Sequence, residues 1–247
     1  MDKIMPTSWR ASSKPHLFCP GCGHAIVLKQ LGFLFDEMNI SRNTTFGIDI
    51  GCSLLAWDFF DIDTVQTHHG RTTPTMVGFK TAKPTRTVLA YMGDGAAYAI
   101  GLQSIIHAAY RNDPVTVITV NNENYAMTGG QMSPETLVGT LTTTTPSGKP
   151  DNLGPGLRGP ELISQVASSN AYIARASISN PIQMKLALKK AIENQMKNNA
   201  FSFLEILSIC PTNWKTNAKD SFAKLNELEK YYSLGQIERK TDEKESK

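Results

Sequence analysis

The chain has 247 residues, 40% of them hydrophobic, enough to bury a substantial core in one large domain or two small ones. Its 25 basic and 22 acidic residues give a formal charge of +3, which is too small to imply binding to nucleic acid or an anionic membrane, because no long basic run concentrates it. No stretch approaches the roughly 20 apolar residues of a membrane span, and the N-terminal residues lack the apolar core of a secretory signal. We therefore expect a cytoplasmic protein.

Helical and strand-like patterns alternate along the chain. Helices are expected at 25–38, 98–111, 161–169 and 182–197, and strands at 45–50, 87–92, 115–120, 172–178 and 202–208. Because the strands are nearly continuous apolar runs separated by helices, they predict an α/β fold with a parallel sheet and helices on both faces.

Two segments depart from this alternation. The stretch 140–160 is rich in Thr, Gly and Pro and is too long for a simple connector, which is typical of a functional loop. After Trp214, the spacing of Leu225, Leu228, Tyr232 and Leu234 predicts one amphipathic helix at the surface or at an interface, with a frayed tail from about Thr241. We expect a main domain over residues 1–214 and a C-terminal helix and charged tail over 215–247.

Three unusual sequences follow predicted strands: Gly-Cys-Ser at 51–53, Gly-Asp-Gly at 93–95 and Asn-Asn-Glu-Asn at 121–124. Ligands of parallel sheets bind at the carboxyl ends of the strands, so these sequences point to one shared site. The carboxylate of Asp94 can hold a hard divalent cation, and the amide oxygen of Asn122, one β-α-β unit later, is a second ligand of that kind. A Gly-Asp-Gly turn alone more often merely turns the chain, but with the Asn-Asn pair it favours a cation and diphosphate site.

The four cysteines form a second candidate site. Cys19 and Cys22 form a CxxC pair, whereas Cys52 and Cys210 lie far from it and from each other in sequence. Four thiolates suit zinc or an iron–sulfur cluster. The alternative from the residues alone is that Cys52 and Cys210 are buried, inert thiols.

Together these motifs resemble the β subunit of 2-oxoacid:ferredoxin oxidoreductases, which bind thiamine diphosphate. The matching segments are FCPGCGH (18–24), IGCS (50–53), HGR (69–71), GDG (93–95), IHAA (106–109), NNENYAMTGGQ (121–131) and CPTNW (210–214). The resemblance covers residues 16 to 214 and implies a thiamine diphosphate-binding fold.

The resemblance also implies roles for individual residues. Asp94, the side chain of Asn122 and the main-chain carbonyl of Asn124 would coordinate Mg²⁺, and Cys19, Cys22, Cys52 and Cys210 would hold a [4Fe-4S] cluster. Contacts with thiamine diphosphate would come from Ile50, Gly51, Cys52, Ser53, Gly95, Ala96, Ala126 and Met127. The sequence departs from the family pattern at Asn124 and Ala126, where an apolar residue and a glycine are expected, and alanine suits position 126 only if its φ is negative.

The activity implied is oxidative decarboxylation of a 2-oxoacid, with coenzyme A as acyl acceptor and ferredoxin as electron acceptor. The chain matches only the diphosphate-binding half of a thiamine enzyme, so we expect an obligate complex with an α subunit that binds the pyrimidine ring. Small γ and ferredoxin-like δ subunits are further candidate partners. His69 and Arg71 are weak catalytic candidates, because a loop histidine and arginine equally often serve only the loop.

The sequence alone is compatible with several substrates and with two other functions. The stretches HGRTTPTMVG and MTGGQMSPETLVG look most like the branched-chain (2-oxoisovalerate) members, with 2-oxoglutarate as the closest alternative and pyruvate behind it. A non-catalytic, zinc-stapled subunit would explain the cysteines but not the paired strand ends. A non-redox thiamine decarboxylase would explain the strand ends but not the cysteines.

Overall fold

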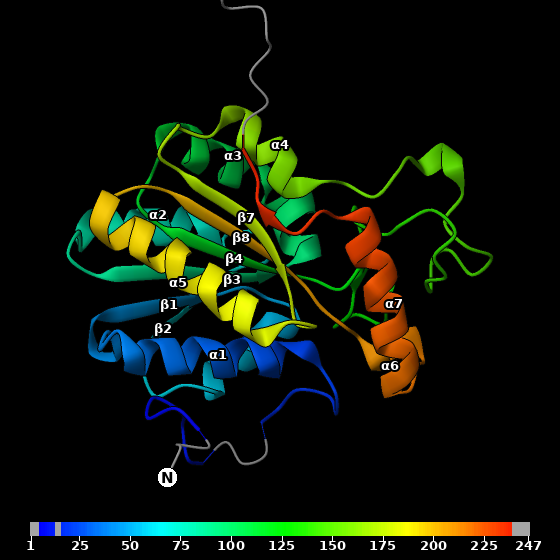
Figure 1. Ribbon diagram of the computed structural model, residues 1–247, viewed down its shortest axis with the longest axis horizontal. Helices are drawn as coiled ribbons and strands as arrows, with labels where there is room; N and C mark the ends of the chain where they lie inside the picture. The colour runs from blue at the N-terminus through cyan, green and yellow to red at the C-terminus, as the bar shows by residue number, and fades with distance from the viewer. Residues whose placement is uncertain (1–4, 13–15, 239–247) are drawn as a thin grey trace, which may run out of the picture.

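A seven-stranded sheet forms the centre of the structure, a computed structural model that describes residues 5–12 and 16–238 (Figure 1). In spatial order its strands are β2 (Asp63–Gln66), β1 (Thr44–Ile48), β3 (Thr87–Gly93), β4 (Thr116–Asn121), β8 (Ser202–Leu207), β7 (Tyr172–Ser177) and β9 (Gly235–Gln236). All neighbours pair in parallel except β9, which is antiparallel to β7. The predicted α/β fold is confirmed.

Helices cover both faces of the sheet (Figure 1). On one face lie α1 (Gly23–Glu37) and α5 (Pro181–Asn198), which contact each other; on the other lie α2 (Thr72–Ala82), α3 (Leu102–Arg111) and α4 (Gly159–Val166). The short helix α6 (Pro211–Trp214) and α7 (Ala218–Tyr231) follow β8 at its carboxyl end, and β5 (Asn124–Tyr125) and β6 (Gln131–Met132) form a separate two-stranded ribbon. Single 3-10 turns span Ser41–Asn43 and Asp151–Leu153, and a longer 3-10 helix spans Cys52–Asp58.

Strand side chains divide between two cores because successive residues of a strand point to opposite faces. On β3, Leu89 and Tyr91 belong to the core under α1 and α5, whereas Val88, Ala90 and Met92 belong to the core under α2, α3 and α4. Both sets are buried, which explains the continuous apolar runs in the sequence.

The predicted elements are present, with three informative differences. The helix expected at 98–111 is interrupted: Ala96–Ile100 form a π-helical turn, closed by the N–H of Gly101 donating to the carbonyl of Ala96 at 2.8 Å, before α3 begins. Strand β2 and helix α2 were not predicted, because β2 is a largely exposed edge strand and α2 is rich in threonine.

The C-terminal helix occurs as α7, and it is not only a surface helix. Leu225, Leu228 and Tyr232 are buried in the core under α1 and α5, and β9 then extends the sheet. The frayed tail expected from Thr241 lies outside the described residues. No helix in the described part of the chain is both long and apolar enough to cross a membrane. The cytoplasmic location is not tested by this finding and stays a prediction.

Candidate functional site

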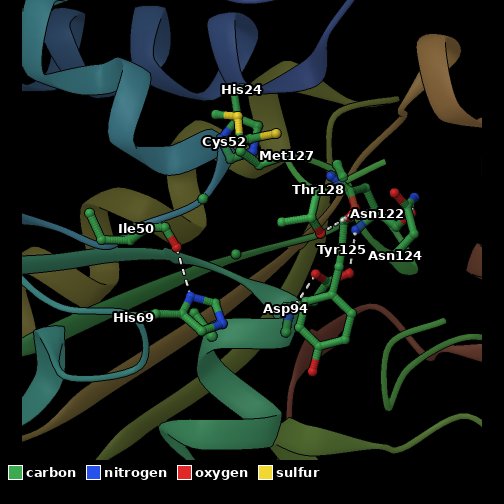
Figure 2. Close-up of a pocket in the computed structure, with 15 residues that line it drawn as sticks. His24, Ile50, Cys52, His69, Asp94, Asn122, Asn124, Tyr125, Met127 and Thr128 are labelled. Carbon is green, nitrogen blue, oxygen red and sulfur yellow. Dashed lines mark hydrogen bonds between the residues drawn. The ribbon is translucent and has the colours of Figure 1, made fainter. Parts of the chain in front are cut away.

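A cavity of about 170 Å³ opens at the carboxyl ends of β1, β3 and β4 (Figure 2). The three strand-end sequences meet at this cavity, as their positions after parallel strands predict. The cavity is lined by His24, Ile50, Gly51, Cys52, His69, Gly93, Asp94, Gly95, Ala96, Asn122, Asn124, Tyr125, Ala126, Met127 and Thr128.

Asp94 is the buried acid of this cavity. It follows the last residue of β3 and is only 3% exposed. Its carboxylate accepts the N–H of Gly95 at 2.7 Å and the N–H of Asn122 at 3.1 Å. Burial raises the pKa of Asp94 to about 7, although the N–H donors of Gly95, Asn122 and Asn124 favour the ionised form. A cation bound beside this carboxylate would favour its ionised form.

Asn122 presents an unused ligand atom. It is 5% exposed, and its side-chain oxygen is buried without a hydrogen-bond partner among the described residues. Its own carbonyl oxygen is already occupied, since it accepts from the Asn124 side chain at 2.6 Å and the Trp214 indole at 3.2 Å. A buried carboxylate and a buried free amide oxygen at neighbouring strand ends are the oxygen donors that Mg²⁺ prefers, so the donor set fits that ion.

The backbone around Asp94 is closely packed. A Cβ atom on Gly95 would lie 2.2 Å from the Tyr125 ring, so only glycine fits there without movement of Tyr125. The N–H groups that follow enter the π-helical turn, and helix starts of this kind offer donors to an anion such as a diphosphate. Ala126 is not among the described residues with positive φ, so its side chain causes no backbone strain.

The four cysteines are free thiols, and Cys52 lines the cavity. Burial is the main cause that raises the pKa of Cys22 and of Cys52 to about 12, and electrostatic interactions with the other cysteines of the set contribute to the same rise. Gly21 of the CxxC turn has φ +76°, and a Cβ atom there would lie 3.4 Å from Pro211, beside Cys210. The donor type suits a Cys₄ cluster. In the described part of the chain, however, no group of three or more Cys, His, Asp or Glu stands ready to hold a metal ion.

Asn213 of α6 links the cysteines to the Asn-Asn loop. Its side-chain NH₂ group donates to the carbonyl of Ala126 at 2.8 Å, to the side chain of Asn124 at 3.3 Å and to the Cys210 sulfur at 3.5 Å. Gly130 must approach this side chain closely, because a Cβ atom on it would lie 3.0 Å from Asn213. The set of four cysteines and the Asp94 site are therefore joined by direct packing and hydrogen bonds.

The remaining predicted residues divide into those at the cavity and those away from it. His69 lines the cavity, whereas Arg71 turns away and donates to the carbonyl of Ile100 at 3.1 Å. Ser53 does not line it either; it is buried and donates to the carbonyl of Asp49 at 3.2 Å. The other predicted cofactor contacts all line the cavity: Ile50, Gly51, Cys52, Gly95, Ala96, Ala126 and Met127.

Four lining residues were not predicted as site residues: His24, Gly93, Tyr125 and Thr128. His24 is stacked on Phe18 and shares a hydrogen bond with the Tyr91 hydroxyl at 2.6 Å, and it also borders the cavity. Tyr125 and Thr128 lie within the NNENYAMTGGQ motif, which was the available signal for them.

The chain is similar to one protein family and to several named proteins. Residues 49–206 match the family described as thiamine pyrophosphate enzyme, C-terminal TPP binding domain. A "Ketoisovalerate oxidoreductase subunit VorA" of Methanothermobacter marburgensis is 37% identical over 92% of this chain and 48% of its own length. A "2-oxoglutarate synthase subunit KorB" of Methanocaldococcus jannaschii is 37% identical over 82% of this chain and 72% of its own length.

A solved structure agrees with these relatives. The "2-oxoglutarate:ferredoxin oxidoreductase from Magnetococcus marinus with 2-oxoglutarate, coenzyme A and succinyl-CoA bound" aligns with a TM-score of 0.80 at 25% identity, over 98% of this chain and 87% of that chain. The chain belongs to the β-subunit-like family of the 2-oxoacid:ferredoxin oxidoreductases. It spans about half the length of the VorA relatives, at 48% and 46%.

The segment that matches the family contains almost all of the cavity lining. The matched thiamine pyrophosphate-binding segment, 49–206, contains β3, β4 and every lining residue except His24. Cys19, Cys22 and Cys210 lie outside that segment.

Proposed function

We propose that this chain is the diphosphate-binding half of a thiamine diphosphate-dependent 2-oxoacid:ferredoxin oxidoreductase, which converts a 2-oxoacid and coenzyme A to acyl-CoA and CO₂. The observation that carries the proposal is the pairing of the buried Asp94 carboxylate with the free, buried oxygen of Asn122 at adjacent strand ends. In this proposal Asp94, the Asn122 side chain and the Asn124 carbonyl hold Mg²⁺, and the ion holds the diphosphate.

Other residues of the chain orient the cofactor and exclude water. Ile50, Gly51, Cys52, Gly95, Ala96, Ala126 and Met127 would contact thiamine diphosphate, with Ser53 supporting the Gly-Cys-Ser turn from beneath. When bound, the cofactor supplies the nucleophile that attacks the keto carbon and the sink for the electrons left after CO₂ departs. Of the two predicted catalytic candidates, His69 lines the cavity, whereas Arg71 stabilises their loop through its hydrogen bond to the Ile100 carbonyl.

Cys19, Cys22, Cys52 and Cys210 are proposed to hold a [4Fe-4S] cluster. Their gathering beside the cavity supports this assignment, because Cys52 borders both sites and Asn213 joins Cys210 to the Asn-Asn loop. The cluster would pass electrons to ferredoxin. Zinc on the same thiolates is the rival assignment, and it would make the chain a structural subunit.

The proposed complex contains an α subunit that binds the pyrimidine half of the cofactor, with γ and δ subunits as further candidates. Within this chain we assign residues 1–214 to the cofactor sites and 215–247 to an appended C-terminal segment. Lys224 of α7 lies 3.3 Å from the buried carboxylate of Glu123 and over the Trp214 ring, so this segment supports the Asn-Asn loop.

We favour 2-oxoisovalerate as the substrate. The described cavity lining contains apolar Ile50, Ala96, Ala126 and Met127, and it contains neither lysine nor arginine to receive a second carboxylate. 2-Oxoglutarate is the second candidate, because VorA and KorB relatives are both 37% identical to this chain.

The test is metal analysis followed by an assay, on the chain assembled with its α subunit without oxygen. About four irons and four sulfides per chain are expected for a Cys₄ cubane cluster, together with Mg²⁺-dependent thiamine diphosphate binding and ferredoxin reduction by 2-oxoisovalerate. Stoichiometric zinc, or an absence of thiamine diphosphate binding, would contradict the proposal. Faster turnover of 2-oxoglutarate would overturn only the choice of substrate.

A further inference from the structure

Asp49, which follows the last residue of β1, has a fully buried side chain. One carboxylate oxygen accepts the N–H of Gly70 at 2.6 Å and the hydroxyl of Thr72 at 3.1 Å. The other oxygen faces Nδ1 of His69 at 3.0 Å. Each oxygen of this buried acid therefore has a partner, and one of the partners is a ring that lines the cavity.

The same ring nitrogen has a second acceptor, which fixes where its proton lies. Nδ1 of His69 is 2.7 Å from the carbonyl oxygen of Ile50, and a carbonyl can only accept a hydrogen bond. Nδ1 must therefore carry a proton, which it shares between Ile50 and Asp49. In the neutral ring, Nε2 is then the nitrogen with the free lone pair.

Nε2 of His69 is on the cavity side of the ring. In Figure 2 the Nδ1 edge faces Ile50, and the opposite edge is turned toward Asp94 and Tyr125. The His69 side chain is 32% exposed, so it can meet a ligand. The other histidine at the cavity, His24, is 1% exposed and engaged with the Tyr91 hydroxyl.

We propose that Asp49 is a positioning residue which, with the Ile50 carbonyl, holds the Nδ1 proton of His69 so that Nε2 exchanges a proton with the keto oxygen of the 2-oxoacid. This inference rests on the proposed function. The proton leaves Nε2 of the doubly protonated ring as the keto oxygen gains charge, and it returns to Nε2 when the carbonyl re-forms. Asp49 stays a carboxylate throughout, as the acid does in a buried acid–histidine pair.

The tautomer can be measured without turnover. Only this chain, with its five histidines, is labelled with ¹⁵N-histidine in the complex, and His69→Gln identifies the His69 signals. We expect the ring, when it holds one proton, to hold it on Nδ1. In Asp49→Asn, the amide oxygen stays with the Gly70 N–H and the Thr72 hydroxyl, so the NH₂ group faces Nδ1 and competes there with the Ile50 carbonyl. The share of singly protonated rings with the proton on Nε2 should therefore rise.

Kinetics then separate a positioning role from a structural one. Asp49→Asn should lower kcat at least about tenfold, as part of the roughly 10²–10⁴-fold that a positioned proton-transfer group contributes, while the Kd for thiamine diphosphate changes less than about twofold. The matched control is Asp63→Asn, on β2 next to β1, whose carboxylate pairs with Arg86 away from the cavity. It should leave both the tautomer and kcat unchanged.

Four outcomes are decisive. A wild-type ring with its single proton on Nε2, or an Asp49→Asn variant with unchanged kcat, overturns the inference while the wild-type complex remains active. A parallel loss of kcat and thiamine diphosphate affinity also overturns it, because that result indicates loosened structure. An inactive wild-type complex overturns the proposed function itself, and the proton-exchange role with it.

Discussion

The N–H of Asn122 donates to the carboxylate of Asp94 across 3.1 Å, and this bond joins the ends of the neighbouring strands β3 and β4. It leaves the side-chain oxygen of Asn122 free and buried. The backbone therefore orients the acid, and the side chain of the same asparagine is kept available for a cation. Because Asn122 orients the acid with its N–H and keeps its side-chain oxygen free, the two residues together indicate a metal and diphosphate site.

Replacing Asp94 separates metal binding from folding. Asp94→Asn should weaken Mg²⁺-dependent thiamine diphosphate binding by at least about tenfold, since an amide provides less charge to the ion. In Asp94→Asn one side-chain oxygen becomes an NH₂ group that faces the N–H of Gly95 or Asn122, so the Tm of the metal-free protein should fall. That fall measures the structural part of the effect, and the further loss of the rise in Tm with Mg²⁺ and cofactor measures the binding part. Calorimetric titration and thermal melts with and without Mg²⁺ and cofactor test both points.

The control for this variant is Asp113→Asn, whose carboxylate pairs with Arg111 at the surface. It should retain the full rise in Tm on adding cofactor. An Asp94→Asn protein that binds thiamine diphosphate as tightly as wild type would contradict the assignment of Asp94 as a ligand.

Gly95→Ala tests the packing of the cavity. The new Cβ atom would lie 2.2 Å from the Tyr125 ring, so the ring must move, and overpacking of this kind costs about 1–3 kcal/mol. Urea denaturation should show that loss, together with weaker cofactor binding. Adding Tyr125→Ala removes the clash, so the stability losses of the two substitutions should not add.

Gly78→Ala, in the interior of α2, is the matched control. A Cβ atom there meets no atom within 4 Å, so the variant should be neutral or slightly more stable, because alanine favours a helix. If Gly95→Ala behaved like this control, the close contact with Tyr125 would be refuted.

Arg175 is the positively charged partner of two glutamates in a buried ion-pair network. Its side chain is fully buried, pairs with the equally buried Glu205 and makes two bonds of 2.7 Å with Glu161. Arg175→Met leaves Glu205 buried without its counter-charge and should lower the free energy of unfolding by about 3–5 kcal/mol. The double variant with Glu205→Gln should recover part of that loss, measured by urea denaturation.

The surface pair Arg111–Asp113 gives the comparison. The Arg111 side chain is 54% exposed, so Arg111→Met should cost less than about 1 kcal/mol. Equal losses from Arg111→Met and Arg175→Met would show that burial does not govern the contribution of these ion pairs.

The contact between α1 and α5 should depend on pH. Hydrogen bonds from Lys189 and Lys185 lower the pKa of Glu37 from its ordinary 4.5 to about 2. A lowered pKa stabilises the fold above pH 4.5, and the gain is lost as the pH falls toward 2. Glu37→Gln should therefore cost less than about 1 kcal/mol at pH 7, because the side chain is 43% exposed.

Denaturation curves at several pH values and salt concentrations measure this effect. The difference between wild type and Glu37→Gln should shrink below pH 4.5 and in high salt. A difference that grows as the pH falls would refute the assigned direction of the pKa change.

The sequence by itself determined the α/β architecture and the motifs that meet at one end of the sheet. Continuous apolar runs such as 87–92 and 115–120 reflect strands buried on both faces, and parallel strands bring their carboxyl ends to one edge. For that reason Asp94 and Asn122 could be paired before their contact was seen.

Only the tertiary structure decided which residues face the cavity. His69 lines it while Arg71, two residues later, turns to Ile100, and Ser53 supports the turn rather than the cavity. Asp49 carries no motif signal, since its role depends on a ring twenty residues away that folding brings within 3.0 Å. Periodicity records burial along a chain, whereas side-chain direction in loops depends on contacts between segments distant in sequence.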